Sequence, residues 1–277
     1  MDSIVLITGA SSGIGKSTVN TLLEKGYVVY GTSRNWNDIL TEKETNYYQI
    51  KLDVTDDNSV SNCVKSVLKK EGKIDVLINN AGFGYVSPLM YGTVNHAKDQ
   101  FETNFFGIIR VIENVMPSMI SQKKGKIINI GSIGGRIAIP YQGLYSASKS
   151  ALAIYSDALR MESKKFNIQV STVEPGDTRT DFNTRRKVIE ENIPENVKNE
   201  MLKALTIMRK AEDTGTNSKK VAKLIYNIVK SKKTKSRYTV GNDAKIVNYG
   251  TRLFPKGVID RLIGSNYKIS NNMKTEN

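Results

Sequence analysis

The chain has 277 residues, of which 39% are hydrophobic and 25% charged, with a formal net charge of +14. This length can bury a large core, and a single α/β domain accommodates it. No apolar run reaches the roughly 18 residues of a membrane-spanning helix. The one cysteine, Cys63, excludes an internal disulfide framework and fits a reducing compartment, so we expect a cytoplasmic protein. The one histidine, His96, has no neighbouring Cys or His at ligand spacing, so we expect no metal site.

The positive charge is concentrated toward the C-terminus. Residues 183–277 carry 21 Lys and Arg against 9 Asp and Glu, whereas residues 1–182 carry 20 against 18. Such a balance suits an anionic partner: a phosphorylated cofactor, an acidic substrate, a nucleic acid or a membrane surface. A solvated, lysine-rich surface is the simpler interpretation, because the basic residues lack the interleaved aromatics of a nucleic-acid platform. We therefore expect no nucleic-acid partner.

Short apolar runs alternate with longer helical segments along the chain. This alternation predicts an α/β fold with a doubly wound, mostly parallel sheet of about seven strands and helices on both faces. Ligands of such folds bind at the carboxyl ends of the strands. The expected strands cover 3–8, 27–32, 47–53, 75–79, 126–130, 168–173 and 237–241, and the expected helices cover about 14–25, 57–70, 98–121, 143–165 and 218–230.

Residues 177–214 depart from the alternation. They follow the sixth expected strand and read as two short helices around Pro194. At the carboxyl edge of a sheet, such an insertion is well placed to cover a bound ligand, although it could also be a surface excursion without a gating role. We expect one catalytic domain over 1–277, with a substrate-covering lid at about 177–214 and a basic C-terminal extension at about 242–277.

The sequence TGASSGIG, residues 8–15, follows the first expected strand and opens a helix. Its glycines allow a tight turn and a close approach of the backbone to a pyrophosphate, which then sits at the positive end of the helix. The spacing is GxxxGxG, not the more common GxGxxG. The predicted cofactor-binding residues here are Gly9, Ser11, Ser12, Gly13, Ile14 and Gly15.

The end of the second strand indicates the choice of dinucleotide. A site for NAD usually has a carboxylate there for the ribose 2′-hydroxyl, but this chain reads GTSRN. Arg34 could stack on adenine and pair with a 2′-phosphate, and Ser33 could donate to it, so NADP(H) is preferred. After the third strand, Asp53 could accept from the adenine amino group or cap the following turn, and Val54 adjoins it as a further cofactor contact.

The string YSASK places Tyr145 and Lys149 one helical turn apart. Residues at i and i+4 lie about 5–6 Å apart at Cβ, so a lysine cation there would stabilise a tyrosinate and lower a pKa that is ordinarily near 10. Ser132 offers a second hydroxyl. Two donors converging on one substrate oxygen make an oxyanion-type site, while a nicotinamide would carry the hydride. A buried core tyrosine with a solvated lysine is the structural alternative.

Taken in order, these motifs resemble the short-chain dehydrogenase/reductases. The matching strings are TGASSGIG (8–15), LDV (52–54), NNAG (79–82), FETNFFG around Asn104, NIGSIGG around Ser132, YSASK (145–149) and PGDTRT (175–180). Within that family, the chain is similar to the branch of hydroxysteroid and retinol dehydrogenases and their bacterial relatives. The resemblance implies a Rossmann-like fold, and a homodimer or homotetramer.

The resemblance also implies a role for each matching residue. Tyr145 would be the general acid or base, and Lys149 would lower its pKa and bind the nicotinamide ribose. Ser132 would polarise the substrate oxygen, and Asn104 would kink its helix and join a proton relay through water. The remaining cofactor contacts would be Asn80, Ala81, Gly82, Pro175, Gly176, Thr178 and Thr180.

The expected substrate is a hydrophobic ketone or secondary alcohol, with a hydroxysteroid or bile acid as the leading example. Besides Ser132 and Tyr145, its predicted contacts are Gly134, Tyr141 and Phe182. Arg136, Arg179 and Arg185 could meet a distal carboxylate, or could be ordinary surface or cofactor-facing arginines. The alternatives are a 3-oxoacyl thioester reductase, a non-catalytic NADPH-binding sensor, and a basic nucleic-acid-binding protein.

Overall fold

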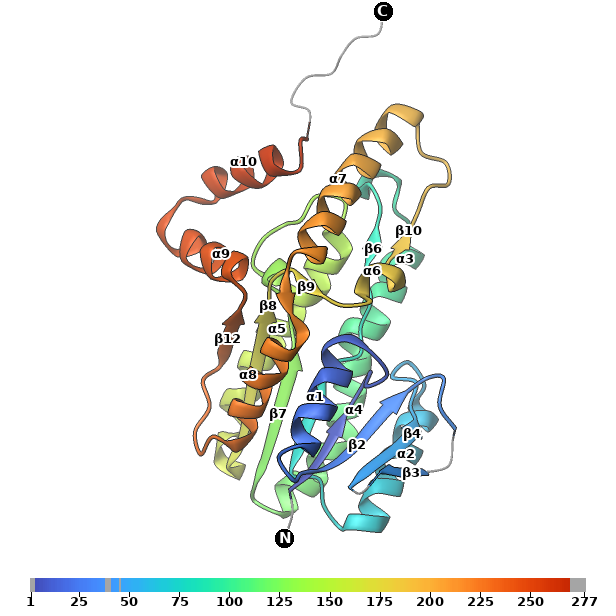
Figure 1. Ribbon diagram of the computed structural model, residues 1–277, viewed down its shortest axis with the longest axis vertical. Coiled ribbons are helices and arrows are strands. Elements are labelled where there is room, and N and C mark those ends of the chain that lie inside the picture. The colour runs from blue at the N-terminus through green and yellow to red at the C-terminus, as the bar shows by residue number, and fades with distance from the viewer. Residues whose placement is uncertain (1–2, 38–40, 45, 270–277) are drawn as a thin grey trace, which may run out of the picture.

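An eight-stranded sheet forms the centre of the computed structural model, which describes residues 3–37, 41–44 and 46–269 (Figure 1). The strand order is β12-β8-β7-β5-β1-β2-β4-β3, and every pair is parallel except β3 with β4. The predicted seven-stranded parallel sheet is therefore confirmed. Its strands are β1 (Ile4–Ile7), β2 (Val28–Ser33), β4 (Tyr47–Lys51), β5 (Val76–Asn79), β7 (Gly125–Ile130), β8 (Ile168–Pro175) and β12 (Arg237–Val240), and the antiparallel edge strand is β3 (Thr41–Glu44).

Both faces of the sheet are buried because side chains alternate across each strand. From β1, Ile4 and Leu6 enter the core against α2 (Asp57–Glu71), α4 (Gly107–Ser121) and α5 (Gly143–Ser163). Val5 and Ile7 enter the opposite core against α1 (Gly13–Leu23) and α8 (Ser218–Lys230). A strand that is buried on both faces needs apolar side chains at consecutive positions, and these strands could therefore be recognised in the sequence.

The helix expected over 98–121 is interrupted. It consists of α3 (Val94–Phe101), a π-helical turn η2 (Glu102–Phe106) and α4. The π turn adds a residue to the ladder and rotates Asn104 into the interior, where its side chain is fully buried. The π turn thus coincides with the position where a kink was expected.

The segment 177–214 lies over the carboxyl end of the sheet. It contains β9 (Thr178–Arg179), α6 (Phe182–Arg185), β10 (Lys187–Val188) and α7 (Glu195–Asp213). The prediction of two short helices around Pro194 is wrong, because one long helix begins directly after that proline. α7 is anchored by Met201 and Leu205, which pack on Val86 of β6 (Tyr85–Val86), and β10 pairs with β6. β11 (Thr216–Asn217) pairs with β9 and leads into α8.

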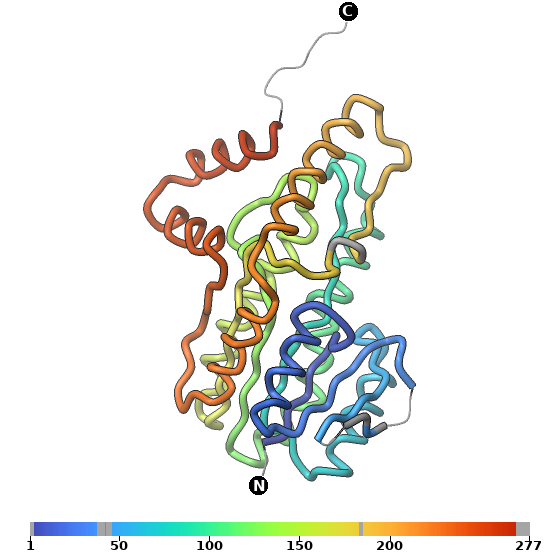
Figure 2. Tube along the Cα trace, in the orientation of Figure 1, coloured from blue at the N-terminus to red at the C-terminus, as the bar shows by residue number. Residues whose placement is uncertain are grey.

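The chain after β12 forms α9 (Asn242–Leu253) and α10 (Lys256–Asn266), which turn away from the sheet and stand apart from its helical layers (Figures 1 and 2). Within 3–37, 41–44 and 46–269, no helix is long and apolar enough to cross a membrane. Within the same ranges, no group of three or more His, Cys, Asp or Glu is placed to hold a metal ion.

Candidate active site

A cavity at the carboxyl ends of β5, β7 and β8 brings together residues that are far apart in the sequence. Its walls include the glycine turn, the YSASK helix and the start of the 177–214 segment. The predicted site residues among them are Ser12, Gly13, Ile14, Asn80, Gly82, Ser132, Tyr145, Lys149, Pro175, Gly176, Thr178, Thr180 and Phe182; the walls also contain Ile130, Gly131, Ile133, Ile139, Gln142, Asp177, Arg185, Arg186 and Glu212.

Ser132 and Tyr145 meet in this cavity. Ser132 follows β7, and its hydroxyl accepts a hydrogen bond from the Gly134 N–H at 3.0 Å. Burial is the largest influence on Tyr145 and raises the pKa of its phenol, while a hydrogen bond with Ser132 and the charge of Arg186 lower it. Loss of hydration disfavours the phenolate and outweighs the influences that lower this pKa, and the lowering expected from Lys149 stays a prediction.

Lys149 lies one turn further along α5. Its ammonium donates to the carbonyl oxygen of Ile130 at 2.8 Å and lies 5.8 Å from the centroid of the Tyr145 ring. Burial lowers the pKa of this lysine to about 8. The i and i+4 spacing thus places the ammonium beside the phenol, and the end of β7 fixes it there.

Asn104 connects this helix to the loop after β5. Its amide donates to the Phe83 carbonyl at 2.9 Å and to the Ser148 hydroxyl at 3.2 Å, while its oxygen accepts from the Phe83 N–H at 3.1 Å. A Cβ on Gly82 would lie 3.1 Å from the Asn104 oxygen and 3.7 Å from the Lys149 ammonium. Asn104 therefore lies close behind the lysine, separated from it by a glycine.

The glycine turn has the geometry of an anion site. Gly9 and Gly13 have positive φ values of 66° and 56°, and a Cβ on Gly15 would lie 2.3 Å from the Gly9 carbonyl oxygen. The side chain of Ser12, at the N-cap of α1, does not cap the helix. Instead it contacts the Arg185 guanidinium, which brings a cation to the positive helix end. This turn fits a pyrophosphate.

Asn80, Ala81 and Gly82 support that turn. The Asn80 amide donates to the carbonyls of Thr8 and Gly9 at 3.0 and 2.9 Å, and the Thr8 hydroxyl accepts from the N–H groups of Asn80 and Ala81 at 3.0 and 3.1 Å. This part of NNAG therefore fixes the end of β1 to the end of β5.

The residues expected around adenosine lie at the ends of β2 and β4, outside the walls of the cavity. Ser33 is the buried last residue of β2, and the exposed Arg34 follows it. Asp53 accepts from both the N–H and the hydroxyl of Thr55, at 3.0 and 2.8 Å, so it caps the turn. Val54 packs against Gly107 at the start of α4.

Residues 175–180 cross the mouth of the cavity. A Cβ on Gly176 would lie 1.9 Å from a carboxylate oxygen of Asp243, which accepts from the Asp177 N–H at 2.6 Å. The Thr178 hydroxyl donates to the Gly176 carbonyl at 2.9 Å. The Thr180 side chain lies 3.3 Å from a Cβ placed on Gly13, so this loop meets the glycine turn.

Three charged residues that the sequence interpretation did not single out line the same cavity: Asp177, Arg186 and Glu212. Arg186 forms an ion pair with Glu212, and the other carboxylate oxygen of Glu212 is buried without a hydrogen-bond partner among the described residues. Burial and the nearby charges of Asp243 and Glu212 raise the pKa of Asp177 to about 6. Burial also raises the pKa of Glu212. Two carboxylates, Asp177 and Glu212, therefore lie at one end of the cavity, its acidic end, together with Arg186, which offsets the charge of Glu212.

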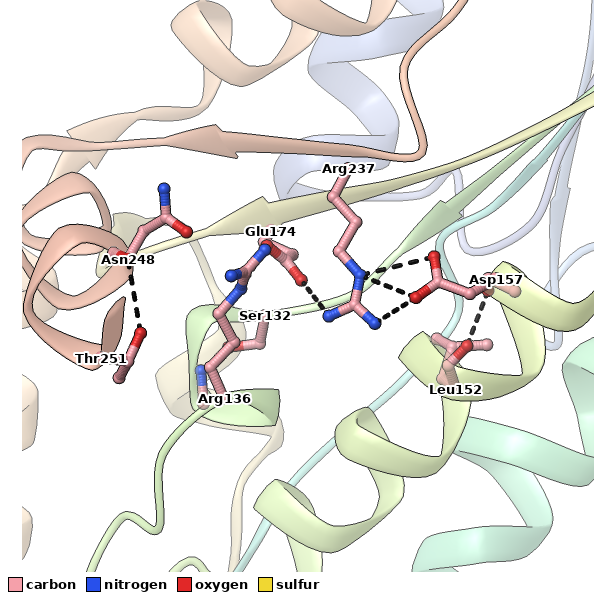
Figure 3. Close-up of polar contacts among 10 residues, drawn as sticks. Ser132, Arg136, Leu152, Asp157, Glu174, Arg237, Asn248 and Thr251 are labelled. Atoms are coloured by element: carbon pink, nitrogen blue, oxygen red, sulfur yellow. Dashed lines mark hydrogen bonds and ion pairs between the residues drawn. The ribbon is translucent and has the colours of Figure 1, made fainter. Parts of the chain in front are cut away.

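Behind Ser132, a second charged network joins β8, β12 and α5 (Figure 3). Glu174, which is 1% exposed, accepts from Arg136 at 2.7 Å and from Arg237 at 3.4 Å. The Arg237 Nε also donates to Asp157 at 3.2 Å. Arg136 is thereby held by Glu174 and is not placed to meet a substrate carboxylate.

The predicted substrate contacts are only partly brought together. The Phe182 ring lies 5.8 Å from the Tyr145 ring between centroids and forms a wall of the cavity. Gly134 lies next to the cavity wall, because a Cβ added to it would lie 3.3 Å from the Ser132 hydroxyl and 2.9 Å from the Ile139 side chain. Tyr141 packs instead with the α7 cluster and lines a neighbouring groove. Contact between Tyr141 and a molecule in the cavity therefore needs that molecule to extend past Ile139.

Comparison with known proteins identifies the family. A family model described as short chain dehydrogenase matches residues 3–190. A 3-ketodihydrosphingosine reductase of Bacteroides thetaiotaomicron is 42% identical over 239 residues, which cover 86% of this chain and 87% of the relative. A short-chain dehydrogenase from Streptomyces avermitilis has a TM-score of 0.76 at 29% identity, covering 96% of this chain and 97% of that one. The NADP-bound protein ElxO has a TM-score of 0.70 at 25% identity, covering 87% and 96%. This chain belongs to the short-chain dehydrogenase/reductase family.

Proposed function

We propose that the protein is an NADPH-dependent reductase of a hydrophobic ketone. The observation that carries this proposal is the hydrogen-bonded pair of Ser132 and Tyr145 in a cavity that also contains the glycine turn. When bound, the dinucleotide supplies the hydride. Ser132 and Tyr145 donate hydrogen bonds to the oxygen on which negative charge develops, and Tyr145 gives it a proton.

The raised pKa of Tyr145 concerns the protonation state from which a reduction starts. A buried phenol stays protonated at neutral pH, and a protonated phenol is the form that donates to a developing alkoxide. Lys149 holds its position through the Ile130 carbonyl and contributes positive charge close to the phenol.

The residues at the end of β2 support NADPH rather than NADH as the cofactor. Ser33 and Arg34 stand where an NAD site has a carboxylate, and a guanidinium pairs well with a 2′-phosphate. The NADP bound to ElxO supports the same choice. Arg185 at the glycine turn would contribute to holding the pyrophosphate.

Two observations support a substrate class: the carboxylates at the acidic end of the cavity, and the ketone named for the relative from Bacteroides. The ketone in that relative's name is a long-chain compound with an amino group beside its carbonyl. Asp177 and Glu212 line the cavity next to Tyr145, and the unpartnered oxygen of Glu212 needs a donor. A long-chain 2-amino ketone, with its ammonium toward these carboxylates, fits the site better than a steroid or a bile acid.

The test is NADPH oxidation by the purified protein with a panel of ketones. The panel contains a long-chain 2-amino ketone, the same ketone without the amino group, a steroid ketone, a bile-acid ketone and a 3-oxoacyl thioester. We expect the highest kcat/KM for the amino ketone. Faster turnover of the steroid or of the thioester would overturn the substrate class, and no NADPH oxidation with any of them would favour a sensor.

A further inference from the structure

The C-terminal helices α9 and α10 expose an unusual amount of apolar surface. Both stand away from the sheet and its covering helices (Figures 1 and 2). A run of large apolar side chains along this pair is 44 to 74% exposed. Single exposed apolar residues are ordinary, but a contiguous series on one substructure marks an interaction site. The residues of this docking face are Ile246, Tyr249, Leu253, Phe254, Val258 and Leu262.

The same two helices are basic. Residues 242–269 contain five Lys and Arg against two acidic residues, so their net charge is +3 (five minus two). Asp243 accepts from the Asp177 N–H at the cavity mouth, and Asp260 pairs with Lys256 at 2.6 Å. Outside the Lys256–Asp260 pair, the exposed cations of these two helices are Lys245, Arg252, Arg261 and Lys268, so their surface is positively charged.

A groove beside α10 adjoins the active site, and it is lined by residues of α10 other than those of the docking face. A space of about 1160 Å³ separates α10 from the loops 88–90 and 138–143, and its wall includes Ile139, which also lines the catalytic cavity. On the opposite rim, Leu89 and Met90 are 58% and 82% exposed. At the end of α10, burial raises the pKa of Tyr267, and the charges of Asp177 and Glu212 raise it further. The groove therefore meets the catalytic cavity at Ile139.

We propose that α9 and α10 dock the protein on an anionic lipid surface, with the apolar side chains entering the headgroup region and the basic side chains meeting the phosphates. Amphipathic helices with a basic polar face bind membrane interfaces through these two contributions. A second copy of the chain is the less suitable occupant, because a two-fold contact would bring the same basic residues together. The inference is independent of which ketone is reduced.

The experiment is sedimentation of the full chain with vesicles in the absence of ketone. We expect binding to phosphatidylcholine vesicles that contain phosphatidylglycerol, little binding to phosphatidylcholine alone, and release at high salt. The double variant Leu253→Ser/Leu262→Ser should lower the bound fraction at least about tenfold. The matched control is Ile154→Ser/Met161→Ser, which alters equally exposed apolar residues on α5 and should leave binding unchanged.

NADPH binding by each variant, followed by fluorescence, verifies that the fold is retained. Absence of binding of the native chain to anionic vesicles overturns the proposal. So does equal binding of the Leu253→Ser/Leu262→Ser variant. A dimer in light scattering that this variant converts to a monomer, without vesicle binding by the native chain, would assign the face to a second copy instead.

Discussion

The acidic end of the cavity predicts a specific dependence on pH and on the substrate's amino group. Raising the pKa of Asp177 from 3.8 to about 6 corresponds to roughly 3 kcal/mol in favour of the neutral acid. A substrate ammonium beside the carboxylate recovers part of this cost, and a hydrogen bond to a charged group contributes about 1.5–3 kcal/mol. Asp177→Asn should therefore raise KM for a 2-amino ketone by about ten- to a hundredfold, with a smaller change in kcat.

The sign of the pH dependence follows from the direction of the shift. Asp177 is ionised above a pH of about 6 and neutral below it, so KM for the amino ketone should rise as the pH falls from about 7.5 to about 5. The ketone without the amino group should show no such rise. Because the folded-state pKa is raised, ionised Asp177 lowers stability as the pH rises through about 6, and Asp177→Asn should melt no lower than the native chain at neutral pH.

The assay is initial-rate NADPH oxidation with both ketones, for the native chain, Asp177→Asn and the control Asp213→Asn. Asp213 is exposed at the end of α7 and is not a wall residue of the cavity, so its variant should behave as the native chain. An equal rise in KM for both ketones would refute recognition of an ammonium by Asp177. An unchanged KM for the amino ketone would refute it as well.

Three further predictions concern the cofactor and the supporting networks. Arg34→Glu should weaken NADPH and favour NADH, measured as a reversal of the ratio of their kcat/KM values, and an unchanged ratio would remove Arg34 from the 2′-phosphate site. Glu174→Gln breaks a buried ion pair with Arg136 and should cost about 3–5 kcal/mol in urea unfolding, whereas a loss below about 1 kcal/mol would contradict its burial. Gly176→Ala places a Cβ against Asp243 and should lower the free energy of unfolding by about 1–3 kcal/mol. It should also weaken the binding of NADPH. A native-like melting temperature together with a native-like NADPH titration would contradict this.

Most of the sheet was predictable because its strands are buried on both faces and read as unbroken Ile- and Val-rich runs. β3 was not, because its sequence TEKE has no apolar pattern and becomes a strand by pairing with β4 at the edge. The π turn at Asn104 could not be predicted from the apolar periodicity, which continues through it, and only the family resemblance indicated a kink there.

The site likewise contains residues that the sequence predicts to converge and residues that it does not. Ser132, Tyr145 and the glycine turn lie directly at strand ends or on one helix face, so local spacing predicts that they converge. Arg186 and Glu212 reach the cavity because α7 packs its Met201 and Leu205 against Val86, a tertiary contact that no local pattern encodes. Asp177 lay within a recognised motif, but its carboxylate became informative only with Glu212 beside it.

Proton donation by Tyr145 is tested most directly by single-turnover reduction of a ketone by the preformed NADPH complex of Tyr145→Phe. This change removes the phenolic hydroxyl that meets Ser132 and leaves the ring against Phe182. We expect NADPH affinity close to that of the native chain and hydride transfer slowed by about 10²–10⁴-fold. Hydride transfer within about tenfold of the native rate would contradict a proton donated by Tyr145.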